Sequence, residues 1–401
     1  MAGGLRDATM ADALVLLIAA LLIAAAAALV ALGLSRHRKR RKARGNADPA
    51  RDYAPRANWG RSRGALNYSS FVFMDVDGDG KFGEADRPMG GIMVRTFDGT
   101  GAFIAAVRTN HGGFANFVMS KKRSRGMFRQ PGTYRFCVSV PAGWRVTTGN
   151  QDQSMRLDDV PGSPAGLAGE DLPRAVGLSP ARFVRGRTES ASTFTLLGRG
   201  APLETRQLAP GDFRFDVPEG ADTLVISGAG LDRRLALAPY PVDLGLLRPG
   251  ALAAEAALER VGFDDVTMLP FQKVPCGYAG LDWRNFNALT SMYVNASEGY
   301  LNGNLSRGHA VYTSSGHPAE FGSTAPFGFY SVMLTAAWLN AEGEMALVES
   351  WLGEELVASD EVALSALAPV QYAPMLKAVT RVRVSTKHSW QAVLDELALT
   401  R

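Results

Sequence analysis

A short acidic segment carries the clearest chemical signal in the sequence. Residues 75–86 read DVDGDGKFGEAD, which matches the calcium-loop pattern D-x-D-x-D-G-x5-[E/D]. In such a loop the alternate carboxylates converge on one cation, and Gly80 at the sixth position permits the sharp turn around it. The expected ligands are Asp75, Asp77, Asp79, Lys81 through its carbonyl oxygen, Glu84 and Asp86.

The oxygen-rich composition of this loop predicts Ca2+ as its cofactor. Without a cation, carboxylates packed into so few residues would repel one another. The last ligand position holds Asp86, whose arm is shorter than that of the usual bidentate glutamate, and Glu84 could substitute for it. The alternative interpretation is an Asp- and Gly-rich surface turn that binds nothing.

A second set of carboxylates stands near the two ends of the C-terminal region. Asp264 and Asp265 lie in the segment GFDDV, and Asp395 lies in the segment VLDEL. The first and last strands of a sandwich commonly pair at one edge, which would bring these side chains together. We expect them to share either a second metal ion or backbone amides.

Aromatic and amide side chains in the same region have the composition of a sugar-binding platform. The candidates are Tyr278, Trp283, Asn285 and Tyr300. In such a platform an aromatic ring stacks on a pyranose and an amide bonds its hydroxyl groups. The alternative is that these rings fill the core of a sandwich, as large aromatic side chains usually do.

Catalytic motifs are not evident in the sequence. The five histidines form no metal-binding pair at helical spacing, and no Gly-x-Ser-x-Gly, HExxH or phosphate-binding glycine motif occurs. The two cysteines, Cys137 and Cys276, support neither a disulfide framework nor a zinc site. We therefore expect no enzyme, with a glycan-active hydrolase assembled in space as the remaining alternative.

The elements that must position these residues are predicted to be mainly β. After residue 66, short apolar or alternating runs are broken by Gly, Pro, Asn and Asp, which is typical of tandem β-sandwich modules. The predicted organisation is a tail at 1–12, a transmembrane helix at 13–34, a basic linker at 35–65, a calcium-loop sandwich at 66–150, a linker at 151–181, a small sandwich at 182–250 and a jelly roll at 258–401.

The N-terminal region predicts one membrane anchor in front of these modules. Residues 13–34 contain no charged side chain and are long enough to cross the hydrocarbon core, which takes ~20 apolar residues. Most of residues 36–44 are Lys or Arg. This positive charge comes after the apolar run rather than before it, which argues against a cleaved signal peptide. The net charge of +4 comes largely from residues 36–63, which are expected to contact membrane lipid or to fix the topology, and no nucleic acid partner is expected.

Residues 69–148 resemble the calcium-binding B-domain of serine-aspartate-repeat surface proteins and the related collagen-adhesin B modules. The resemblance is carried by the run FVFMDVDGDGKFGEADRPMGGIMVRTFDGTG, followed in order by TNHGGFANFV, PGTYRFCVSV and PAGW. It departs from the family at the basic insertion 121–125. The resemblance implies a calcium-stiffened β-sandwich used as a stalk.

Residues 261–399 resemble a jelly-roll, carbohydrate-binding-like module found at the ends of exported bacterial and fungal proteins. The segments that carry it are GFDD, YAGLDWRNF, GYLNG, TAAW and VLDEL. The resemblance implies a fold more firmly than a ligand. Residues 183–245 are similar to carboxypeptidase-regulatory-like sandwiches, which implies a spacer.

Together these patterns predict a membrane-anchored cell-envelope protein in which a stalk presents a module that binds glycan or a surface polymer. The alternative is a structural or protein-interaction subunit of an envelope assembly, with its aromatic side chains in the core. The basic residues after the anchor favour a cytoplasmic location by the positive-inside rule. The resemblances favour an exported, periplasmic or extracellular one, because cytosolic Ca2+ is too scarce for a low-affinity loop. We favour export.

Overall fold

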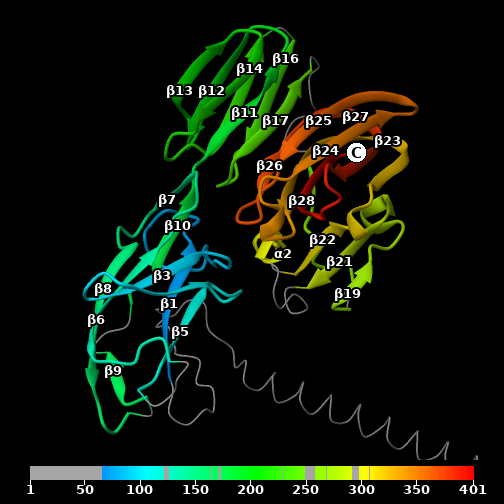
Figure 1. The fold of residues 1–401 in the computed structure, drawn as a ribbon. Coiled ribbons are helices and arrows are strands. Elements are labelled where there is room, and N and C mark those ends of the chain that lie inside the picture. The colour runs from blue at the N-terminus through cyan, green and yellow to red at the C-terminus, as the bar shows by residue number, and fades with distance from the viewer. Residues whose placement is uncertain are drawn as a thin grey trace, which may run out of the picture. The chain divides into compact units, whose positions relative to one another are not determined.

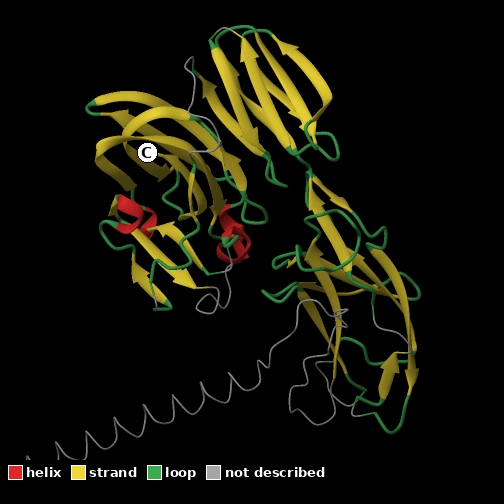
Figure 2. Ribbon diagram, turned by 180° about the vertical axis from the view of Figure 1, so that it is seen from behind, coloured by secondary structure: helices red, strands yellow, loops and turns green. Residues whose placement is uncertain are grey.

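The computed structural model describes residues 66–121, 126–163, 165–169, 173–228, 230–248, 258–267, 269–290, 298–306 and 308–401. The expected tail, transmembrane helix and basic linker, residues 1–12, 13–34 and 35–65, lie outside the described residues. Within the described ranges, no helix is long and apolar enough to span a membrane. The fold class is mainly β, as predicted, with strands dominating every module (Figure 2).

The first module is built from two sheets (Figure 1). One has the order β2-β1-β10-β7, with β5 also paired to β1. Its strands are β1 (Leu66–Met74), β2 (Arg87–Pro88), β5 (Phe114–Met119), β7 (Trp144–Val146) and β10 (Val176–Pro180). The other has the order β4-β3-β6-β8-β9. Its strands are β3 (Met93–Asp98), β4 (Phe103–Arg108), β6 (Gly132–Val138), β8 (Asp152–Asp159) and β9 (Leu167–Gly169).

Strand β1 is the centre of this module because both of its faces are buried. Val72 and Met74 point into the core with Phe117 and Phe136. Phe71 and Phe73, on the opposite face, stack on each other at 6.1 Å between ring centroids. A strand anchored on both sides is a rigid base for the acidic loop that leaves its end.

The predicted linker at 151–181 is corrected by the structure. Strand β8 pairs with β6 from Gly132↔Leu157 to Cys137↔Asp152, and β10 pairs in parallel with β1. The first sandwich therefore extends to Pro180. The Pro- and Gly-rich composition of 161–181 indicated a loop, but the strands it flanks depend on pairing with residues far away in the sequence.

The middle module has one sheet of its own and shares a second. The first has the order β13-β12-β15-β16, from β12 (Ser192–Gly198), β13 (Ala201–Leu208), β15 (Thr223–Gly228) and β16 (Leu231–Ala236). The second contains β11 (Phe183–Thr188), β14 (Gly211–Asp216) and β17 (Val242–Leu247). Strand β17 pairs in parallel with β26 of the terminal module through Val242↔Gln371 and Asp243↔Tyr372. The middle module is therefore joined to the terminal module through a shared sheet.

The terminal module is organised around one long strand, β23 (Ala319–Ala336). One part of β23 pairs with β20 and β27, and its C-terminal part pairs with β26 and β28. The pairing register shifts between Gly322 and Phe329, so the strand passes from one part of the sheet to the other there. A single large core follows, with Phe321, Phe329 and Tyr372 among its fully buried side chains.

The other elements of the terminal module flank this strand. They are β18 (Glu259–Val261), β19 (Phe271–Lys273), β20 (Asp282–Arg284), β21 (Phe286–Thr290), α2 (Glu298–Gly303), β22 (His309–Thr313), β24 (Met345–Leu352), β25 (Glu355–Ala363), β26 (Val370–Tyr372), β27 (Leu376–Thr386) and β28 (Ala392–Thr400), with single 3-10 turns at Tyr278–Gly280, Ser314–Gly316 and Leu339–Ala341. As expected, the first strand pairs with the last, β18 with β28.

Candidate metal centre

The acidic loop is closed at its base by the sheet. Asp75 directly follows β1 and Asp86 directly precedes β2, and these two strands pair through Met74↔Arg87 and Phe73↔Pro88. Phe82, inside the loop, packs edge-on against Phe71 at 5.1 Å between ring centroids. The strands and this aromatic contact therefore hold the first and last acidic residues of the loop side by side.

Asp75 is the innermost of these carboxylates, with none of its surface exposed. Its Oδ1 accepts the N–H of Gly78 at 2.7 Å, and its Oδ2 accepts the N–H of Gly80 at 2.9 Å. Both glycines have a left-handed backbone, with φ of 77° and 74°, which turns their N–H groups toward the carboxylate. The loop is thus wrapped around Asp75.

Asp86 holds the other end of the loop in the same way. It is 3% exposed, and it accepts the N–H groups of Val76 at 2.8 Å and Gly83 at 2.7 Å. Burial raises the pKa of its carboxyl group, and the neighbouring carboxylates of Asp75 and Asp77 raise it further, against the lowering effect of the two N–H groups. A cation at this point would offset both the desolvation and the repulsion.

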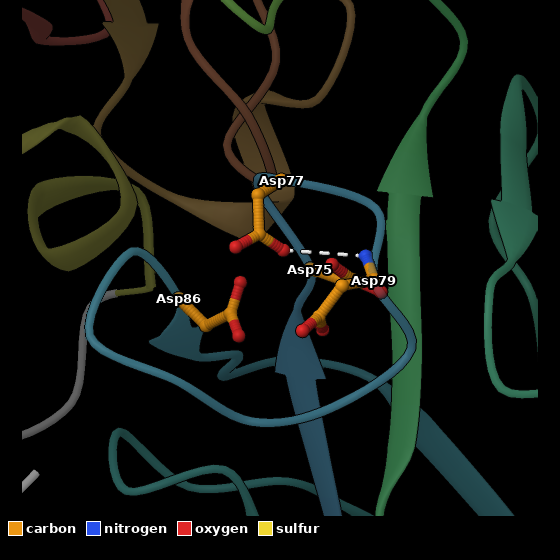
Figure 3. Close-up of side chains that lie close together, drawn as sticks. All are labelled: Asp75, Asp77, Asp79 and Asp86. Atoms are coloured by element: carbon orange, nitrogen blue, oxygen red, sulfur yellow. Dashed lines mark hydrogen bonds between the residues drawn. The ribbon is translucent and has the colours of Figure 1, made fainter. Parts of the chain in front are cut away.

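Asp77 and Asp79 complete the group from the exposed side. Ligand oxygens of Asp75, Asp77, Asp79 and Asp86 all lie within 4.8 Å of one another, and the carboxylates of Asp77 and Asp86 face each other (Figure 3). No other group of three or more potential ligand side chains is this close within the described part of the chain. Hard carboxylate oxygens suit a Group 2 cation rather than a soft metal.

Two of the six predicted ligands are not among these four carboxylates. The backbone N–H of Lys81 donates to Asp79 Oδ1 at 2.7 Å, which fixes the turn at the position expected to offer a carbonyl. Glu84 is exposed and stands outside the group. Asp86 itself therefore fills the last position of the loop pattern. The pairing of β1 with β2 brings its short side chain close to the other three carboxylates.

In the second set of carboxylates, one side chain, that of Asp395, is bonded to backbone amides, which was one of the two expected arrangements. Asp395 on β28 is fully buried and accepts the N–H groups of Leu305 at 2.6 Å, Ser306 at 3.1 Å and Glu396 at 2.8 Å. Asp265 instead accepts the hydroxyl of Tyr278 at 2.7 Å. The structure does not gather Asp264, Asp265 and Asp395 into a close ligand group.

The buried carboxyl of Asp395 predicts a pH dependence of stability. Burial raises its pKa to about 7 in the folded state, while an unfolded aspartate titrates near ~3.9. Between these values the folded state binds the extra proton, so stability falls as the pH rises from about 4 to about 7. Melting temperatures measured across this range in chelator should show the fall. Asp395→Asn should flatten the profile, and parallel profiles for the two proteins would contradict the assignment.

The predicted sugar platform is largely core. Trp283 is 7% exposed and packs against Phe286 at 5.3 Å and Phe321 at 5.2 Å between ring centroids. Tyr300 is 5% exposed and donates its hydroxyl to Gln391. Neither ring presents a face to a sugar.

The other two platform candidates have structural contacts. Asn285 has a φ of 58°, and its amide donates to the carbonyl oxygens of Ser314, His317 and Pro318, so it stabilises a turn. The hydroxyl of Tyr278 donates a hydrogen bond to the Asp265 carboxylate. Exposed tryptophans occur elsewhere, at Trp338 and Trp390, and neither was predicted as a sugar contact, although Trp338 ends the segment TAAW.

No family model matches the chain, and no curated protein matches it. Among solved structures, the Bacillus anthracis TIE protein is 12% identical over 45% of this chain and 33% of its own, with a TM-score of 0.23. The chain thus spans about a third of that protein. The shaft pilin spaA of Lactobacillus rhamnosus GG is 9% identical over 47% of this chain and 98% of its own, with a TM-score of 0.22.

A tandem carbohydrate-binding CBM22 domain from Paenibacillus barcinonensis Xyn10C is 8% identical over 65% of this chain and 93% of its own, with a TM-score of 0.21. At such identities and TM-scores, these neighbours carry no argument about function. The functional argument rests on the side chains of this chain, above all on the four carboxylates of the acidic loop.

Proposed function

We propose that this protein is a non-enzymatic, membrane-anchored envelope protein whose first sandwich is stabilised by one Ca2+. In this proposal the sandwich is a stalk, and the terminal module binds a glycan or another surface polymer. The observation that carries the proposal is the convergence of four carboxylates, those of Asp75, Asp77, Asp79 and Asp86, within 4.8 Å of one another.

Calcium fits this group better than magnesium. Magnesium is usually bound by one or two carboxylates and keeps several of its waters, whereas calcium accepts six to eight oxygens in flexible geometry. Here four carboxylates converge, and the exposure of Asp77 and Asp79 leaves an open side for water ligands. The ligand number and the open side together support Ca2+.

The proposed location follows from the proposed metal. Loops of extracellular modules bind Ca2+ with affinities of ~10⁻⁴ to 10⁻³ M, and such loops fill outside the cytosol. The basic residues 36–44 favour the opposite orientation, but long domains cross a membrane largely regardless of flanking charge. We therefore place the soluble part on the exported side.

The second candidate function is a structural or protein-interaction subunit of an envelope assembly. The burial of Trp283 and Tyr300 favours it, because it removes two members of the expected sugar platform. This candidate retains the calcium-stabilised sandwich and differs only in the terminal module.

Thermal unfolding of the full chain in detergent tests the calcium part of the proposal. Ca2+ at 10 to 100 times its dissociation constant should stabilise the folded state by about 1.4 to 2.7 kcal/mol. This should raise the melting temperature by about 5 to 10 °C relative to the same protein in chelator. Mg2+ at equal concentration should produce a smaller rise. Identical melting curves in Ca2+ and chelator would reject the site.

A further inference from the structure

The terminal module exposes two tryptophans, one just after the end of β23 and one just before the start of β28. Trp338 is 39% exposed and Trp390 is 36% exposed, whereas Trp283 and Trp351 of the same module are buried. Single exposed apolar side chains are ordinary on a protein surface. Two exposed indoles at the paired ends of two strands are less ordinary, because large aromatic side chains gain the most from burial.

The paired ends of β23 and β28 bring the two residues near each other. Ala336 at the end of β23 pairs with Ala392 at the start of β28, and the N–H of Ala337 donates to the carbonyl oxygen of Gln391 at 3.0 Å. The chain remains extended at Trp338, with φ of −131° and ψ of 143°. Trp338 and Trp390 each lie one residue beyond this hydrogen bond.

Both tryptophans are held in place by their surroundings. The Trp338 ring meets Tyr300 edge to face at 5.6 Å, and Tyr300 meets Tyr312 in the same manner at 5.1 Å. The carbonyl oxygen of Trp338 accepts the N–H of Ala341 at 2.8 Å, and that of Trp390 accepts the hydroxyl of Thr386 at 2.5 Å. The Trp338 ring and the backbone at both tryptophans are therefore held in place.

The surroundings of the pair are polar. Asn340 and Ser389 are exposed beside the two tryptophans in the sequence. The His388 side chain is 65% exposed, and its Nδ1 lies 2.9 Å from the Glu344 carboxylate, which is buried. A membrane-inserting surface would carry aliphatic side chains at these positions. Flat apolar rings bordered by hydrogen-bonding groups instead suit a pyranose, which offers C–H faces and equatorial hydroxyls.

We propose that Trp338 and Trp390 form the stacking platform of a saccharide subsite that takes the pyranose rings of a neutral polysaccharide. This inference rests on the glycan-binding role proposed for the terminal module and gives that role a location. It replaces Trp283 and Tyr300 as the aromatic contacts. Ser389 and Gln391 flank Trp390 in the sequence, and His388 lies two residues before it.

Sedimentation with insoluble cellulose, xylan, chitin and peptidoglycan tests the subsite with the full chain in detergent. Trp338→Ala and Trp390→Ala should each weaken binding to the retained polysaccharide at least tenfold, and Trp→Phe at either position should restore part of it. Leu356→Ala is the matched control, because Leu356 is 49% exposed in the same module. It should bind as the unsubstituted protein does, and all variants should keep its melting temperature.

The outcomes separate the subsite from the wider proposal. Unchanged binding in both tryptophan variants would overturn the subsite and leave the glycan-binding role intact. No binding of the unsubstituted chain to any of the four polymers would overturn both. Loss of binding to phosphatidylglycerol vesicles, rather than to polysaccharide, in these variants would also overturn the subsite and assign the rings to a lipid surface.

Discussion

Asp75→Asn is expected to abolish the rise in melting temperature that Ca2+ produces. Asp75 is the innermost carboxylate of the four, and its neutral amide removes one of the charges that would attract the cation. The amide also turns an N–H2 group toward the N–H of Gly78 or Gly80, which leaves a buried donor unpaired at a cost of about 1 to 3 kcal/mol. The variant should melt lower than the unsubstituted protein in chelator and show no response to Ca2+.

Asp98→Asn is the matched control for this prediction. Asp98 lies in an exposed turn of the same module, where its carboxylate accepts the N–H groups of Thr100 at 2.9 Å and Ala102 at 3.0 Å. It thus resembles Asp75 in its backbone contacts but belongs to no close group of carboxylates. The control should keep the full response to Ca2+. A response that survives in Asp75→Asn, or disappears in Asp98→Asn, would contradict the assigned site.

Trp283→Ala is expected to lower the free energy of unfolding by about 3 to 5 kcal/mol, because it opens a cavity in the core. The lost contacts include those with Phe263, Phe286 and Phe321, and the hydrogen bond from Nε1 to the carbonyl oxygen of Tyr278 at 2.9 Å. Urea unfolding of the full chain in detergent measures this loss.

Trp390→Ala provides the comparison for Trp283→Ala, because the same substitution at an exposed position should change the free energy of unfolding by no more than about 0.5 kcal/mol. The two variants thus separate the structural role of one tryptophan from the proposed binding role of the other. If Trp283→Ala is stable but no longer sediments with polysaccharide, Trp283 contacts the sugar after all, and its assignment to the core alone is wrong.

The close group of carboxylates in the acidic loop could be predicted from sequence because its members are local. All four carboxylates fall within residues 75–86, so the spacing alone brings them together once the chain turns at Gly78 and Gly80. The sequence did not show that Glu84 would stay outside the group. That outcome depends on the pairing of β1 with β2, which fixes Asp86 at the mouth of the loop.

The aromatic residues were harder to assign, because composition does not distinguish a core ring from an exposed one. A local signal for Trp283 was available in the alternation of Asp282, Trp283 and Arg284, where the two charged neighbours are exposed and the indole points inward. Trp390 comes at the end of a polar turn, and its proximity to Trp338 depends on the register of two strands separated by more than fifty residues.

The end of the first sandwich was missed for a similar reason. Strand β10 joins β1 through the parallel pairs Val72↔Val176, Phe73↔Gly177 and Met74↔Leu178, about a hundred residues apart. A short strand of this kind has no periodicity long enough to recognise. The tandem-sandwich architecture was nevertheless predicted, because alternating runs and turn residues are themselves local features.

Titration calorimetry of Ca2+ into the full chain in detergent, freed of metal by chelator, tests the central claim most directly. The acidic loop predicts one saturable site per chain with a dissociation constant of ~10⁻⁴ to 10⁻³ M. Asp75→Asn, titrated alongside, should give no binding heat. The absence of saturable binding to the unsubstituted chain at millimolar Ca2+, or equal binding by the variant, would contradict a calcium site built on Asp75, Asp77, Asp79 and Asp86.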